Sequence, residues 1–118
     1  MCVVALARQV HPDWPLILIG NRDEFHARAA APLGAWSDDS GIVAGRDMQA
    51  GGTWLGVHAA RGRIVVVTNV RGELPDPAKA SRGALVVDML RGDGRFADPA
   101  AADLAGFNAF NLFAIGSD

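Results

Sequence analysis

Runs of apolar residues, separated by Gly, Pro and Asp, divide the chain into short segments, most of which have the length and composition of β-strands. The segment 63–69 (Arg-Ile-Val-Val-Val-Thr-Asn) has the strongest strand preference because β-branched residues dominate it. Residues 25–41 are rich in Ala, Pro and Asp without a clear period, which predicts a surface loop. The segments predicted as strands are 2–9, 16–19, 42–45, 53–58, 63–69 and 110–115.

Two segments in the second half of the chain carry the end signals of helices. Ser81 is a suitable N-cap for a helix that Gly92 ends. Asp98 followed by proline has the N-cap and first-position pattern of a second short helix, which ends at Gly106. The expected fold class is therefore α+β, with a largely antiparallel sheet and two helices.

The first two strand segments are expected to form a hairpin. A turn of His-Pro-Asp, residues 11–13, separates segment 2–9 from segment 16–19. An antiparallel pairing brings the start of the first strand to the end of the second. The hairpin therefore predicts that Cys2 lies close to the tetrad Asn-Arg-Asp-Glu at positions 21–24.

Composition and charge narrow the functional classes. The 118 residues suit one globular domain, which we expect to span 1–118, and a net charge of −2 argues against a nucleic-acid partner. No apolar run reaches the roughly 18–20 residues that span a bilayer, and no basic stretch precedes the apolar N-terminal run, so neither membrane insertion nor secretion is expected. A cytoplasmic location follows as an expectation.

The residues that commonly hold metals are sparse. The single cysteine excludes an internal disulfide and a Cys-based zinc site. Histidines 11, 26 and 58 lack metal-ligand spacing. We therefore expect no bound metal and no cofactor.

Cys2 is the first candidate for chemistry. Removal of Met1, which a small second residue permits, would leave a thiol and a free α-amine on one residue. An α-amine has a pKa of about 7.7–8.0, so part of it is neutral near pH 7 and can act as base toward its own thiol. A retained Met1 instead leaves the nitrogen of Cys2 as an amide. The alternative is a small apolar residue at the start of a strand, a common place for free cysteine.

The tetrad at 21–24 is the second candidate. Carboxylates of Asp23 and Glu24 could orient an amine or thiol, and the guanidinium of Arg22 would favour a thiolate nearby. The alternative is a turn at the end of a strand, closed by an ion pair between Arg22 and a carboxylate.

Two further blocks follow later strands. In Gly-Gly-Thr-Trp, residues 51–54, small residues permit close backbone approach beside the aromatic ring of Trp54. Asn69 follows the best strand and could donate to a developing oxyanion, and Arg71 could bind a substrate carboxylate. The alternatives are a glycine turn, a core tryptophan and an asparagine that caps a loop.

In their order along the chain, these motifs resemble the NRDE family, also called the transport and Golgi organisation 2 family. The resemblance covers essentially the whole chain, and the tetrad with the Gly-Gly-Thr-Trp block is its most specific part. The matching blocks are 1–2, 19–25, 51–56, 68–71, 81–83 and 110–112.

The resemblance extends to N-terminal-nucleophile hydrolases of the cysteine type, such as bile salt hydrolase and penicillin V acylase. It implies a four-layer αββα sandwich, of which this chain is the N-terminal part, and cleavage of a linear amide of a small molecule. By similarity Cys2 matches the nucleophile, and Asn21 with Asp23 matches an Asn-x-Asp pair whose Asp holds the amine. Those enzymes carry an arginine before the Asn, where this chain has Gly20; here Arg22 lies between Asn and Asp. The implied catalytic set is Cys2, Asn21, Arg22, Asp23 and Asn69, and the implied substrate-binding set is Glu24, Trp54 and Arg71.

A non-enzymatic carrier or trafficking factor, related to haem or lipid, is the alternative function on the same fold. Family members are considerably longer than this chain, so the domain 1–118 is expected to be incomplete at its C-terminal side. A half-sandwich exposes one sheet face, which makes a homo-oligomer one expected outcome. The expected partner is a small-molecule ligand.

Overall fold

The structure, a computed structural model, describes residues 2–38 and 40–116, with the side chains of residues 101 and 102 left out. The fold is α+β with antiparallel sheets, as the sequence predicts. Strands β1 and β2 form one sheet, and β3 to β7 form a second sheet in the order β3-β4-β5-β6-β7. The strands are β1 (Val3–Arg8), β2 (Leu16–Asn21), β3 (Ala30–Ala35), β4 (Ile42–Asp47), β5 (Leu55–His58), β6 (Arg63–Asn69) and β7 (Phe110–Ile115). The helices are α1 (Arg82–Arg91), α2 (Ala101–Leu104) and a 3-10 turn, η1 (Ala59–Arg61).

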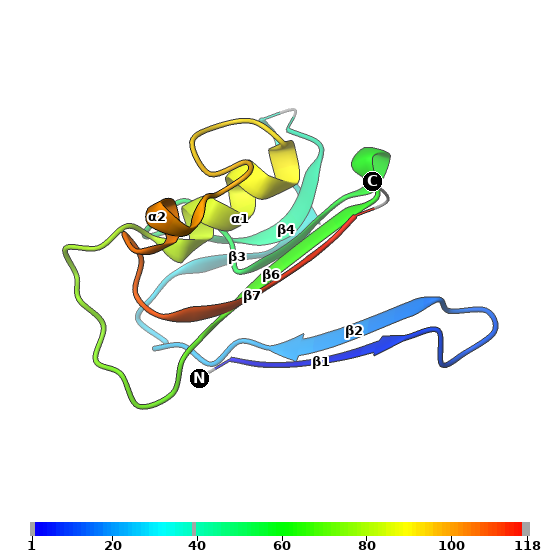
Figure 1. The fold of residues 1–118 in the computed structure, drawn as a ribbon, viewed down its shortest axis with the longest axis horizontal. Coiled ribbons are helices and arrows are strands. Elements are labelled where there is room, and N and C mark those ends of the chain that lie inside the picture. The colour runs from blue at the N-terminus through cyan, green and yellow to red at the C-terminus, as the bar shows by residue number, and fades with distance from the viewer. Residues whose placement is uncertain (1, 39, 117–118) are drawn as a thin grey trace.

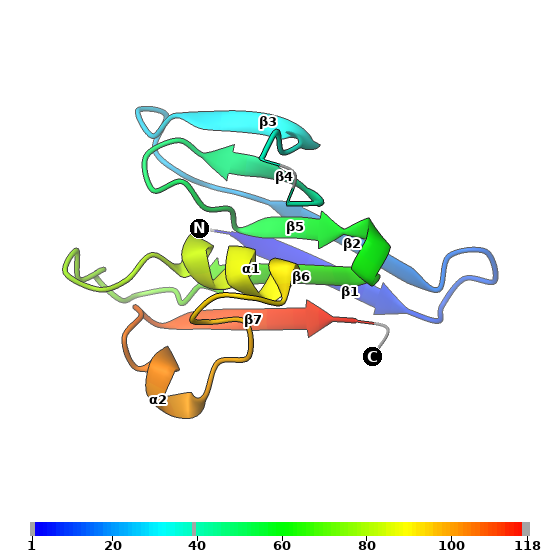
Figure 2. The same cartoon turned by 90° about the horizontal axis from the view of Figure 1, so that it is seen from above.

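The two sheets and the helices form layers. Helix α1 lies across one face of the five-stranded sheet, and the β1–β2 hairpin lies against the opposite face (Figures 1 and 2). In both views the turn of the hairpin extends past the end of the larger sheet. The N-terminal end of β1 is therefore brought under the middle strands of the larger sheet.

The core fills the space between α1 and the larger sheet. Leu85, Val86 and Leu90 are the buried side chains of α1, as expected for the inward face of an amphipathic helix. They pack with residues of β4 and β6 and with Phe107. Alternation along β6 places Val66, which is 1% exposed, on the other face, toward the hairpin. The core cluster consists of Ile42, Ala44, Val65, Val67, Leu85, Val86, Leu90 and Phe107.

The predicted hairpin is confirmed. Its strands pair antiparallel with Val3 opposite Asn21 and Val4 opposite Gly20. A Cβ built on Gly20 would lie 2.9 Å from Cη2 of Trp54, so this position of β2 faces the larger sheet and has no room for a side chain. We call this the inner face of the hairpin; Cys2 shares it because successive residues of a strand alternate. Ile19 lies on the outer face and is 66% exposed.

Two expectations need correction. Residues 25–41 do not form a loop throughout, because 30–35 form strand β3. Its small residues lack β propensity, and the strand forms by pairing with β4, with an irregularity in register between Ala31 and Gly34. The second helix, expected over 98–106, is only the single turn α2; the carboxylate of Asp103 accepts the backbone N–H of Ala100 at 3.1 Å. The helix expected over 81–92 and the strand over 110–115 are confirmed.

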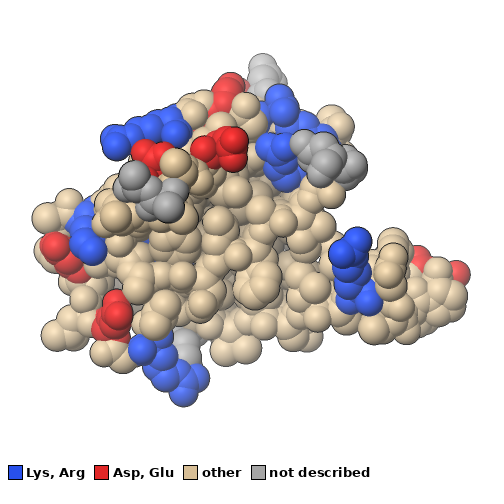
Figure 3. All heavy atoms as spheres, in the orientation of Figure 1, with Lys and Arg blue, Asp and Glu red and all other residues tan. Residues whose placement is uncertain are grey.

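Charged side chains are unevenly spread over the face seen in Figure 3. The hairpin and the middle of this face are mainly uncharged, whereas charged groups gather over the helical layer and around the periphery. Within the described part of the chain, no helix is both long and apolar enough to cross a membrane.

Candidate functional site

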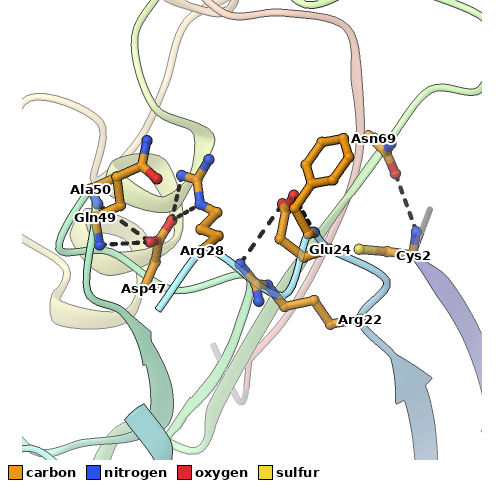
Figure 4. Close-up of polar contacts among 9 residues, drawn as sticks. Cys2, Arg22, Glu24, Arg28, Asp47, Gln49, Ala50 and Asn69 are labelled. Atoms are coloured by element: carbon orange, nitrogen blue, oxygen red, sulfur yellow. Dashed lines mark hydrogen bonds and ion pairs between the residues drawn. The ribbon is translucent and has the colours of Figure 1, made fainter. Parts of the chain in front are cut away.

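A hydrogen bond links the start of β1 to the end of β6. The backbone N–H of Cys2 donates to Oδ1 of Asn69 at 3.2 Å, across 67 residues of sequence (Figure 4). Cys2 is half-buried and its thiol is free. In Figure 4 its sulfur points toward Arg22 and Glu24, away from Asn69. The hairpin and the larger sheet therefore meet at the candidate nucleophile.

Cys2 and Asn69 lie in the wall of an open cleft of about 540 Å³. The residues after β2, the loop before β5 and the segment leading into α1 contribute to the same cleft. Chain segments that are far apart in sequence thus line the same cleft as the thiol of Cys2. Its lining includes Cys2, Arg22, Asp23, Glu24, Arg28, Asp47, Thr53, Trp54, Asn69, Lys79 and Arg82.

The tetrad forms the ion pair that a strand-end turn predicts. Nη2 of Arg22 lies 3.8 Å from Oε2 of Glu24, and both side chains are partly exposed. Oε1 of Glu24 also accepts the backbone N–H of Phe25 at 3.0 Å. Because this pair is long and reaches solvent, its contribution to stability is small, on the order of 0–1 kcal/mol. Asp23 lines the cleft beside it.

A stronger ion pair holds the segment that follows the tetrad. Nε and Nη2 of Arg28 both donate to Oδ2 of Asp47, at 2.9 and 2.5 Å (Figure 4). The other oxygen of Asp47 accepts the backbone N–H groups of Gln49 and Ala50, at 2.9 and 3.3 Å. Asp47 therefore binds the loop after β2 to the turn after β4.

The pKa values of this pair follow from these contacts. Partial burial acts to raise the pKa of Asp47, but the hydrogen bonds from Arg28 and from the two backbone N–H groups outweigh it, and the pKa is lowered. The hydrogen bond to Asp47 raises the pKa of Arg28. Both groups are therefore charged at neutral pH.

The glycines of the Gly-Gly-Thr-Trp block permit a backbone contact with α1. A Cβ on Gly52 would lie 2.5 Å from the carbonyl carbon of Gly83, in the first turn of the helix. Thr53 beside it is 3% exposed and donates its hydroxyl to the carbonyl of Leu55 at 3.1 Å. The close backbone approach predicted for this block therefore occurs between Gly52 and Gly83. It holds the first turn of α1 at the wall of the cleft.

Two cations lie where the chain enters α1. Nζ of Lys79 donates to the carbonyl oxygen of Phe107 at 3.4 Å, and Nη1 of Arg82 donates to that of Ala109 at 2.8 Å. Both side chains therefore attach to one short segment, 107–109, at the edge of the cleft.

With this geometry established, comparison with known proteins identifies the family. The sequence profile of the family described as Transport and Golgi organisation 2 matches residues 1–118. The chain belongs to this family. A Mus musculus protein named Transport and Golgi organization 2 homolog is 36% identical over 100 residues, which cover 79% of this chain and 36% of that protein.

Two other relatives cover nearly the whole chain. The Bos taurus Transport and Golgi organization protein 2 homolog is 32% identical over 124 residues, 97% of this chain and 45% of its own length. The Drosophila melanogaster Transport and Golgi organization protein 2 is 32% identical over 130 residues, 98% of this chain and 46% of its own length. The chain thus spans less than half the length of these members of the Transport and Golgi organisation 2 family.

Most of the residues singled out from the sequence of this Transport and Golgi organisation 2 chain share the cleft, but two of the eight do not line it. Asn21 pairs with Val3 at the end of β2 and is exposed. Arg71 lies in the turn after β6. The six that line the cleft are Cys2, Arg22, Asp23, Glu24, Trp54 and Asn69.

Six charged residues of the cleft lining were not singled out from the sequence: Arg28, Arg46, Asp47, Asp76, Lys79 and Arg82. Arg28 and Asp47 are 19 residues apart in sequence, and no local spacing connects them. Arg82 stands within a block shared with the Transport and Golgi organisation 2 family, which was the available signal for it, and Lys79, the sole lysine, had none. Among the described residues, no group of three or more His, Cys, Asp or Glu side chains could hold a metal ion.

Proposed function

We propose that this chain carries the nucleophile site of an N-terminal-nucleophile amidohydrolase that acts on a linear amide of a small molecule. The observation that carries the proposal is the contact between Cys2 and Asn69 in the wall of a cleft that also contains Asp23. The resemblance to the cysteine-type hydrolases implies the rest of the αββα sandwich. In the Transport and Golgi organisation 2 relatives, the additional length offers room for it.

The reaction begins when removal of Met1 converts the amide nitrogen of Cys2 into an α-amine. This amine takes the thiol proton, and the sulfur attacks the carbonyl carbon of the substrate amide, forming a C–S bond and a tetrahedral oxyanion. The resulting ammonium gives its proton to the amide nitrogen, the C–N bond breaks and the amine leaves. Water then attacks the thioester, with the α-amine as base, and the C–S bond breaks to release the acid and restore the thiol.

The neighbours of Cys2 suit this scheme in distinct ways. Oδ1 of Asn69 already accepts a hydrogen bond from the nitrogen of Cys2, so it is placed to orient the α-amine. Its Nδ2 is then the group that can donate to the oxyanion. The carboxylate of Asp23 would hold the ammonium form. Trp54, Glu24 and Arg22 offer an apolar and a charged wall to the substrate.

The decisive experiment measures the intact mass of the protein made in its native host, with and without iodoacetamide at pH 7. Loss of Met1 together with fast alkylation of Cys2 is the expected result. Retained Met1 with a slow thiol contradicts the proposal, because an amide nitrogen cannot act as the base. Cys2 is the sole cysteine, so each added carbamidomethyl group on a thiol reports this site.

Two variants of Asn69 separate its two roles. Asn69→Asp keeps an oxygen that accepts from the α-amine but loses the Nδ2 donor, so we expect near-normal alkylation and loss of amide turnover of about 10²–10³-fold. Asn69→Ala removes both groups and should slow alkylation as well. Equal turnover in Asn69→Asp and the unaltered protein would remove Asn69 from the oxyanion site.

The carrier alternative predicts binding without cleavage. A protein that keeps Met1, cleaves no amide and still binds a ligand in the cleft would favour it. The many charged groups of the lining argue against an apolar ligand such as a lipid chain. A haem titration without a Soret shift at micromolar protein would exclude the haem form of this alternative.

A further inference from the structure

Lys79 and Arg82 are two cations of the cleft lining that have no carboxylate partner among the described residues. Arg46, a third such cation, donates Nε to the carbonyl of Gly51 at 3.0 Å and lies over the ring of Trp36. Arg22 pairs with Glu24, and Arg28 pairs with Asp47. Over residues 2–38 and 40–116, the structure gives Lys79 and Arg82 no carboxylate partner; each donates to a main-chain carbonyl. Those bonds use one donor of each cation, which leaves two on the ammonium and four on the guanidinium.

The two cations are held near one another by the segment 107–109. Their carbonyl acceptors belong to Phe107 and Ala109, which are two residues apart and so separated by at most about 7 Å along the chain. Asn108 between them is fixed by two hydrogen bonds with the main chain of Asp76, at 2.8 and 3.0 Å. The segment 107–109, to which both cations donate, is therefore held in place by the main chain of Asp76.

The nearby carboxylate of Asp76 does not neutralise them. Its Oδ1 accepts the backbone N–H of Ala78 at 2.9 Å, which turns it toward its own loop. This end of the cleft thus carries two positive charges and one negative charge. Both cations keep free N–H donors for a carboxylate, which forms charge-assisted hydrogen bonds of about 2.7–2.9 Å with such groups.

Resting on the proposed function, we propose that the substrate is an amide that also carries a carboxylate, which Lys79 and Arg82 bind while the amide carbonyl faces Cys2. An N-acyl amino acid is the simplest compound of this class. Binding at the carboxylate places the amide beside the sulfur without using the groups that act on it, so the two cations determine specificity and take no part in bond breaking.

Protection of Cys2 from iodoacetamide tests this proposal without requiring turnover. The probe is N-benzoylglycine, and its control is N-benzoylglycinamide, which has the same shape without the charge. We expect the acid to protect Cys2 at a concentration about tenfold lower than the amide, because a carboxylate forms stronger, charge-assisted hydrogen bonds with the two cations. The same measurement on compounds with one and two further methylenes between amide and carboxylate shows which spacing protects Cys2 best. A benzoyl thioester on Cys2 would also block alkylation, and the intact mass distinguishes it from protection by bound ligand.

Matched variants assign the effect to these cations. Lys79→Gln and Arg82→Gln should each abolish the preference for the acid, whereas Arg8→Gln, which removes the same charge outside the cleft lining, should keep it. Arg82→Lys keeps a charge and should retain part of the preference, which excludes a folding defect as the cause. Equal protection by acid and amide at every spacing, or an unchanged preference in both Gln variants, overturns the proposal. A retained Met1 with a preserved preference contradicts the hydrolase instead and leaves the anion site standing.

Discussion

Arg28 and Asp47 join the loop after β2 to the turn after β4 through two hydrogen bonds on one carboxylate oxygen. The side chain of Asp47 is 16% exposed, whereas that of Glu24 in the pair with Arg22 is 31% exposed, so water screens the carboxylate of Asp47 less. The pair therefore fixes where the tetrad lies relative to the larger sheet, although it has no direct contact with Cys2 in the structure.

Asp47→Asn should destabilise the fold. The amide keeps an oxygen but loses the charge that attracts Arg28, and the partly buried guanidinium is left without its counter-ion. We expect a loss of about 1–3 kcal/mol in the free energy of unfolding at pH 7, measured with urea. Asp13→Asn in the exposed turn of the hairpin is the control and should change it by less than about 0.5 kcal/mol. Equal effects of the two variants would contradict a structural role for the pair.

The same pair should make stability depend on acid pH. The pKa of Asp47 is below its ordinary value of 3.8 in the folded protein. A lowered folded-state pKa adds stability that is fully present above the unfolded value of about 3.9 and is lost as the pH falls through the folded value. The difference between the unaltered protein and Asp47→Asn should therefore shrink below pH 4. The stability of Asp47→Asn should still fall somewhat at acid pH, because the pKa of Asp38 is also lowered, chiefly by its hydrogen bond with Ser40. A constant difference from pH 7 to pH 2 would exclude this linkage.

The contact between Gly20 and Trp54 should limit what β2 tolerates. In Gly20→Ala the new methyl group would meet the indole ring, so we expect a loss of about 1–3 kcal/mol on thermal or urea unfolding. Gly34→Ala in β3 is the matched control, because a Cβ there has no heavy atom within 4 Å. Adding Trp54→Phe, which removes the far ring of the indole, should recover part of the loss. A loss in Gly34→Ala as large as that in Gly20→Ala would assign the effect to the backbone.

The close approach of the loop before β5 to α1 gives a harder constraint. A methyl group on Gly52 would meet backbone atoms of Gly83, which cannot rotate away, so Gly52→Ala should cost at least as much as Gly20→Ala. It should also shift α1 at the wall of the cleft and slow alkylation of Cys2. A variant that melts normally and reacts normally would show that the loop and the helix can separate without cost.

The sequence was informative where local pattern decides structure. The β-branched run of β6 and the capped periodicity of α1 predicted these elements almost to the residue. Strand β3 was not predicted because its small residues form a strand only through pairing with β4. Asn69 could be selected as a polar group at the end of a strand, but its partner Cys2 lies 67 residues away, and only the layering of the hairpin on the sheet brings them together. Arg28 and Asp47 had no local signal for the same reason.

The outer face of the hairpin should make the 118-residue chain self-associate. Val3 and Ile19 on this face are 57% and 66% exposed, and Ile17 lies beside them. Exposed apolar surface of this kind favours burial against another surface. Sedimentation velocity should show association that rises with concentration, and Ile19→Lys should weaken it. Leu74→Lys is the control, because Leu74 is 96% exposed and belongs to the segment between β6 and α1, not to the hairpin. Equal weakening by both variants, or a monomer at every concentration, would mean that this face does not drive association.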